Sequence, residues 1–275
     1  MTGFVRFTPR SHHPATLSSG VQMERNSTSE AIVLTNRRWG ELHRLVTLLS
    51  PSLGVFDAVA YGARKGKLAG GIEPFTIGTF YLYHNGAKNT YSITDIDPQY
   101  RVDAIRTDLR RLYTANTLAE LAMRMHGGDF SELYSVLCNH VLLLSDDSVD
   151  PRQVLIQYIW KFVRIMGLEP DLTACPVCSR TFGEQEILSF NTGLHVPCCD
   201  KCADVDTGGF ELALGPGARK YLVLTRTLSD HDSVLVELSE TATLRLVGYM
   251  IRYVTNILGG PLRSLAGGVL QGTMQ

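Results

Sequence analysis

The sequence predicts an α+β protein of several domains, in which a small N-terminal β-barrel is followed by an all-helical domain with an inserted cysteine-rich segment. Three observations predict this arrangement. Short apolar runs separated by turn residues fill residues 28–97. From Arg101 onward the apolar residues recur at helical spacing. Five of the six cysteines lie between Cys175 and Cys202.

The barrel is expected from about five strands within roughly 70 residues. The strand run TSEAIVLTN is followed by the polar connection RRWGELH, and RLVTLLS resumes the apolar pattern. Pro51 and Gly54 bracket a turn before VFDAVAYGA, and the loop ARKGKLAGG precedes the alternating run EPFTIGTFYLYHN. Asn85-Gly86 marks another turn before NTYSITDI. An OB-fold is the natural candidate for a barrel of this size.

The helical domain is expected from five segments with helical periodicity, at 105–125, 130–146, 151–167, 216–228 and 239–258. Asp150 and Pro151 predict a capped helix start, and the hydroxyl of Ser239 can cap the last helix. The predicted domains are therefore a disordered extension over 1–27, an OB-fold over 28–97 and a helical domain over 98–275.

The cysteine-rich segment contains two CxxC pairs, Cys175/Cys178 and Cys199/Cys202. Disulfides and a metal are the two alternatives. The first 23 residues lack the apolar run of a secretory signal, and no run approaches the 18 or so apolar residues of a membrane span, so the protein is expected in the cytoplasm, where thiols stay reduced. Paired CxxC spacing then favours one structural zinc ion in a closed four-thiolate site of a zinc ribbon, over an empty or a redox site.

The ligand set is open at one position. Cys198 adjoins Cys199 and could replace it, and His195 is also near, although CxxC geometry favours Cys199. Cys138 lies alone in an apolar helical stretch, where a small buried side chain is expected instead of a nucleophile.

No enzyme is expected. The phosphate-loop, HExxH and GxSxG motifs are absent from the sequence, the eight histidines are scattered, and no candidate catalytic residue emerges. The formal net charge is −1, but residues 1–97 carry ten basic against seven acidic residues. This bias is compatible with a phosphate-binding surface and does not establish one.

Six basic residues lie in or beside the expected barrel loops, where they could contact the phosphates of a nucleic acid. An ordinary solvated surface explains the same composition equally well. The six residues are Arg37, Arg38, Arg44, Arg64, Lys65 and Lys67.

The order of these pieces resembles the bacterial RecO family of DNA repair proteins. The runs that carry the resemblance are AIVLTNRRWGELHRLVTLLSPSLGVFDAVAYGARK, GGIEPFTIGTFYLY, LRRLYTANTLAELA, RIMGLEPDLTACPVCSRTF and GLHVPCCDKC, within about Thr28 to Leu258. The resemblance implies an OB-fold followed by a helical domain with a zinc finger. It also implies a nucleoid-associated recombination mediator without chemical catalysis.

The resemblance further implies binding to single- and double-stranded DNA, strand annealing, and work with RecR to help RecA replace single-strand-binding protein. Basic positions of the family's OB-fold match Arg37, Arg38, Arg44, Arg64 and Lys65, and its zinc-binding pairs match the cysteines. Two departures stand out. Ser179 replaces the glycine that usually follows the first CxxC, and HVPC replaces the usual residues before Cys199.

The tail of single-strand-binding protein is acidic with an apolar end, so its site should combine an apolar groove with a basic rim. The helices over 151–167 and 239–258 could supply the groove, with Arg164, Arg245 or Arg252 as rim candidates. The alternative function is a protein–protein adaptor without DNA affinity.

Overall fold

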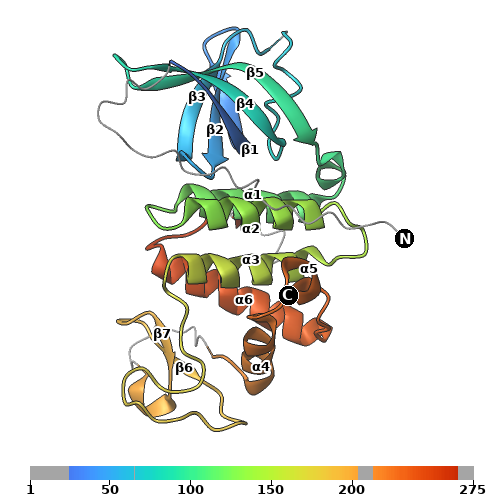
Figure 1. Ribbon diagram of the computed structural model, residues 1–275. Helices are drawn as coiled ribbons and strands as arrows, with labels where there is room; N and C mark the ends of the chain where they lie inside the picture. Colours follow the sequence, from blue (N-terminus) through green and yellow to red (C-terminus); the bar gives the residue numbers. More distant parts are fainter. Residues whose placement is uncertain (1–24, 65, 204–212, 266–275) are drawn as a thin grey trace. The chain divides into compact units, whose positions relative to one another are not determined.

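A computed structural model of the chain describes residues 25–64, 66–203 and 213–265 (Figure 1). The chain divides into two compact units. One unit holds the residues up to Arg106 together with Gly127–Ser145, and the other holds Thr107–His126 and the residues from Asp146 onward. Of the extension expected over 1–27, residues 1–24 lie outside the described residues. The first strand begins at Asn26. None of the described helices has both the length and the apolar character needed to cross a membrane.

Five strands form a closed barrel in the order β1-β2-β3-β5-β4, so the prediction of an OB-like barrel is confirmed. Only the β3–β5 pair is parallel within this barrel. The strands are β1 Asn26–Trp39, β2 His43–Ser50, β3 Gly54–Ala60, β4 Ile77–Asn85 and β5 Thr90–Tyr100.

Alternation along the strands builds the barrel core, because successive strand residues point to opposite faces of a sheet. Val46 and Leu48 of β2 and Ala58 and Ala60 of β3 point inward, where they join Phe80 and other apolar residues in one cluster. The connection between β1 and β2 is shorter than expected: Arg37 and Arg38 belong to β1, and only Gly40–Leu42 form the turn.

Strand β1 changes its register at the loop that precedes β4. Its pairing with β2 shifts between Val33 and Thr35. At this point Phe75 N donates to Val33 O at 2.8 Å, and Val33 N donates to Thr76 O at 2.9 Å. Phe75 is buried in the left-handed region with φ of 69°. The strand expected from Glu73 therefore begins only at Ile77, because a left-handed residue interrupts an extended strand.

Helix α2 (Phe130–Leu143) belongs to the barrel unit. Asp129 caps it by accepting from Ser131 N and Glu132 N, both at 2.9 Å. The ring of Phe130 packs on Gly54, where an added Cβ would lie 3.1 Å from the ring. Burial raises the pKa of the Cys138 thiol on this helix, in agreement with its expected role as a small buried residue.

The second unit contains the other five described α-helices and a two-stranded ribbon, which confirms the predicted helical domain. Asp150 caps α3 through Arg152 N at 2.8 Å, with Pro151 as the first helical residue, and Ser239 Oγ accepts from Ala242 N at 3.3 Å to cap α6. The short α5 had no counterpart among the predicted segments. The elements are α1 Leu109–Met123, α3 Pro151–Ile165, β6 Ser189–Asn191, β7 Val196–Cys198, α4 Pro216–Thr225, α5 Asp230–Val234 and α6 Glu240–Ile257.

Candidate metal centre and nucleic-acid interface

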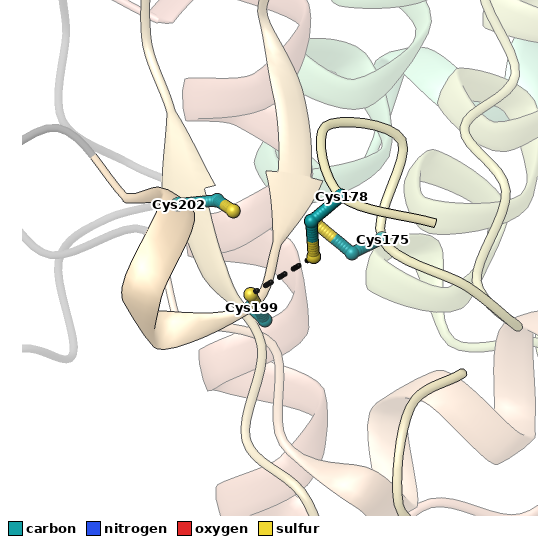
Figure 2. Close-up of side chains that lie close together, drawn as sticks. All are labelled: Cys175, Cys178, Cys199 and Cys202. Atoms are coloured by element: carbon teal, nitrogen blue, oxygen red, sulfur yellow. Dashed lines mark hydrogen bonds between the residues drawn. The ribbon is translucent and has the colours of Figure 1, made fainter. Parts of the chain in front are cut away.

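The two CxxC pairs come together at the cysteine ribbon. Cys175 and Cys178 lie on a tight turn in which Ser179 N donates to Cys175 O at 2.8 Å. Cys199 follows β7, and Cys202 ends the 3₁₀ turn Asp200–Cys202. The four side chains point toward one another (Figure 2), and their Sγ atoms all lie within 4.8 Å of one another.

The spacing of the sulfur atoms fits a metal better than a disulfide. Cys178 Sγ and Cys199 Sγ are 3.8 Å apart, whereas a disulfide bond is about 2.0 Å long. Four thiolates at about 2.3 Å from a tetrahedral zinc ion would lie about 3.8 Å from one another. These residues therefore form a cluster that could hold a metal ion.

The thiols of the cluster have shifted pKa values. Burial disfavours the Cys175 thiolate, but the backbone N–H groups of Cys199, Cys178 and Val177 outweigh it and lower the pKa of Cys175 to about 6. The hydrogen bond between Cys202 and Cys199 instead raises the pKa of Cys202 to about 12. The neighbouring cysteines oppose loss of the Cys202 proton, and a bound cation would favour it, because metal ions bind the thiolate form.

The structure assigns Cys199, not Cys198, to the cluster. Cys198 is buried at the end of β7 and is not among the four clustered cysteines, and neither is His195. Two supporting residues were not predicted: Arg180, which hydrogen-bonds to Cys199, and Asn191, whose Nδ2 donates to Cys202 O at 3.0 Å. The sequence signal that could have identified both residues is a polar side chain within the cysteine-rich segment.

The basic residues predicted for DNA are divided by the structure into two groups. Arg37 and Arg38 are exposed near the end of β1, just before the turn. Arg44 lies on β2 directly opposite Arg38. Arg64 joins them, because its Nη1 donates to Glu41 O at 2.6 Å and its backbone N–H donates to Leu42 O at 3.3 Å. Four of the six therefore gather at the β1–β2 turn.

The remaining two positions differ. Lys67 lies on the same loop as Arg64, but its Nζ is 2.8 Å from Asp95 Oδ2 of β5. This hydrogen bond is the main cause that holds the pKa of Asp95 below its usual range. Lys65 lies outside the described residues. Arg44 is also engaged, since its Nη1 donates to Asn36 Oδ1 at 3.0 Å, whereas Arg37 and Arg38 are exposed.

Comparison with known proteins matches two family models to consecutive parts of the chain. The family model "Recombination protein O N terminal" matches residues 23–100, and "Recombination protein O C terminal" matches residues 106–266. The chain belongs to the RecO family. The two RecO matches meet near the end of β5 and together cover most of the chain.

Curated RecO relatives agree in name and in extent. "DNA repair protein RecO" from a Roseiflexus species is 30% identical over 242 residues, which cover 86% of this chain and 83% of the relative. The protein of the same name from Desulfitobacterium hafniense is 31% identical over 192 residues, covering 68% of this chain and 67% of the relative. The one from Alkaliphilus metalliredigens is 27% identical over 183 residues, covering 65% and 73%. The predicted membership of a DNA repair family is confirmed.

Proposed function

We propose that this RecO-family chain is a recombination mediator that binds single- and double-stranded DNA and anneals complementary strands. With RecR, it helps RecA to replace single-strand-binding protein, without chemical catalysis of its own. The observation that carries the proposal is the group of Arg37, Arg38, Arg44 and Arg64 at one end of an OB-like barrel. OB-folds commonly bind nucleic acids through the β2–β3 face and the adjoining loops, and the β1–β2 turn is one of those loops.

The arginine group suits the phosphate backbone. Guanidinium groups make charge-assisted and often bidentate hydrogen bonds to phosphate. Such contacts carry little sequence information, so the chain should bind DNA of any sequence with similar affinity. Lys67 is a weaker candidate because its charge is already paired with Asp95.

The metal in this proposal is one structural zinc ion per chain, held by Cys175, Cys178, Cys199 and Cys202. The all-cysteine donor set and its spacing support zinc. Four protein ligands leave no open position for water, so the ion would stabilise the fold of the ribbon and would not supply a nucleophile. A zinc-dependent enzyme is therefore not part of the proposal.

The proposed site for the acidic tail of single-strand-binding protein is a groove of about 670 Å³ at the end of α6. Ile251, Leu262 and Leu265 supply apolar walls, and Arg252 and Arg263 supply positive charge. Of the three rim candidates, Arg252 lines this groove, whereas Arg164 and Arg245 are not among its lining residues. Calorimetric titration with a tail peptide tests this contact, and an absence of binding heat would contradict it.

Salt-dependent DNA binding tests the main proposal. The variant R37A/R38A/R44A removes three positive charges from the barrel end. Each lost phosphate contact is expected to reduce the slope of log affinity against log salt by about one unit. The variant should therefore bind single strands and duplexes of all sequences more weakly than the wild type, and it should anneal complementary strands more slowly. Fluorescence anisotropy between about 50 and 200 mM salt measures the slope.

The matched control is R37K/R38K/R44K, which keeps the three charges and should keep most of the salt slope. A folded alanine variant that binds and anneals like the wild type at every salt concentration would exclude the barrel end as the DNA site. A wild-type chain with no salt-dependent DNA binding would favour the adaptor function instead.

A further inference from the structure

Three aromatic rings lie in a row beside the arginine group of the barrel. Trp39 of β1 pairs directly with His43 of β2. The rings of His43 and Tyr61, the residue after β3, are 5.0 Å apart at 75°. Trp39 is 46% exposed and Tyr61 is 62% exposed, so two large rings face solvent on either side of β2.

The register of the barrel places this row on its outer face. Val46 and Leu48 point into the core, so His43 and Thr47 point outward, and Thr47 Oγ1 makes an exposed hydrogen bond to Asp57. Thr35 pairs with Thr47 and therefore lies on the outer face. Trp39 lies four residues further along β1 and so shares that face, because every second residue of a strand points to the same side. The register shift between Val33 and Thr35 produces this arrangement, because Val33 itself belongs to the core.

The row is held in place before any ligand arrives. Gly62 N donates to His43 Nδ1 at 3.0 Å, which fixes the imidazole orientation. The Arg37 guanidinium carbon lies 5.6 Å from the centroid of the Trp39 ring, within cation–π distance. Arg64 ties the loop after Tyr61 to the turn through Glu41 O. A pre-ordered surface loses less entropy on binding than a mobile one.

We propose that Trp39 and Tyr61, with His43 between them, form a base-stacking platform for single-stranded DNA, flanked by a phosphate contact from Arg37, which lies on the same face. This inference rests on the proposed DNA binding and adds a second kind of contact to it. Every base has an aromatic face that can stack on a side-chain ring, and cationic side chains beside the rings match the backbone that links the bases. In a duplex those faces are already stacked on one another, so the rings should discriminate single strands from duplexes.

The fluorescence of Trp39 reports stacking directly. The chain has two tryptophans, and Trp160 is 4% exposed, with no hydrogen-bond partner for its Nε1 among the described residues. W160F in the full chain therefore leaves Trp39 as the single indole reporter without loss of a hydrogen bond. Oligothymidylate should quench its emission to saturation, whereas a duplex of equal length should quench it much less.

Ring removal supplies the second arm of the experiment. W39L and Y61L should each weaken oligothymidylate binding by about fivefold to a hundredfold, the range expected for one stacked base. Duplex affinity and the salt slope should stay near the wild-type values, because no charge is lost. W39F and Y61F keep a ring and should retain most of the affinity, and melting curves verify that all four variants are folded.

The outcomes separate this inference from the function on which it rests. Saturable, salt-dependent oligothymidylate binding with unchanged Trp39 emission and unchanged W39L affinity would overturn stacking and leave the DNA-binding proposal standing. Equal weakening of single-strand and duplex binding in W39L would also overturn it, because a general loss is not stacking. A wild-type chain that binds neither nucleic acid would remove both proposals.

Discussion

Ser179 has a left-handed backbone conformation, with φ of 59°, directly after the first cysteine pair. Glycine adopts this conformation freely, whereas other residues are less stable there by about 1–2 kcal/mol. The glycine that the RecO pattern usually carries at this position therefore has a conformational reason. Ser179 keeps the same turn, since its N–H still donates to Cys175 O. The departure seen in the sequence leaves the geometry of the cysteine cluster intact.

At the same scale, the choice between two adjacent cysteines is a testable prediction. C199S should lower zinc content well below one ion per chain and destabilise the ribbon, because metal-binding free energy is also folding free energy. C198S is the matched control and should retain zinc, since Cys198 lies outside the cluster. Mass spectrometry of native protein and colorimetric zinc release measure both. Full zinc retention in a C175S/C178S variant would exclude this site altogether.

At the scale of elements, the last turn of α1 holds one wall of the groove at the end of α6. Glu120 accepts from Arg263 N at 2.9 Å and from Ser264 N at 2.7 Å. Arg124 donates to Gly260 O at 3.1 Å and to Pro261 O at 2.6 Å, and it also pairs with Glu120 at 2.7 Å. Two side chains one helical turn apart therefore anchor the segment that follows α6.

This anchor gives a pH-dependent contribution to stability. Burial raises the pKa of Glu120, but the N–H groups of Ser264 and Arg263 outweigh it and hold the pKa below its ordinary value of 4.5. A lowered folded-state pKa stabilises the protein above pH 4.5 and loses that contribution as the pH falls through the folded value. E120Q should therefore reduce the free energy of unfolding by about 1 kcal/mol at pH 7 and by less at pH 3.5 or so.

Urea unfolding at both pH values measures this difference. E237Q is the matched control, because Glu237 is exposed and its carboxylate has no partner among the described residues. An E120Q penalty that is the same at both pH values would show that the Glu120 charge does not contribute.

At the scale of the whole molecule, the two units are interleaved along the chain. The barrel strands are contiguous, and their core cluster uses residues between Ala31 and Ile96. The chain then contributes α1 to the second unit, returns to the barrel unit with α2, and enters the second unit again at Asp146. The predicted boundaries at 97 and 98 follow the change of periodicity and stay a prediction, because periodicity reports the type of an element and not the unit it packs in.

The sequence by itself determined the barrel of short strands, the helical segments, the caps at Asp150 and Ser239, and the pairing of two CxxC motifs. Each of these depends on local alternation, helical period or spacing over a few residues. The tertiary structure decided that Cys199 joins the cluster, that Lys67 is paired with Asp95, and that Arg64 fastens a distant loop to the β1–β2 turn. It also decided which face of the barrel carries Trp39, because one register shift in β1 reverses the alternation of its side chains. That shift depends on the hydrogen bonds of Val33 with Phe75 and Thr76, some forty residues away.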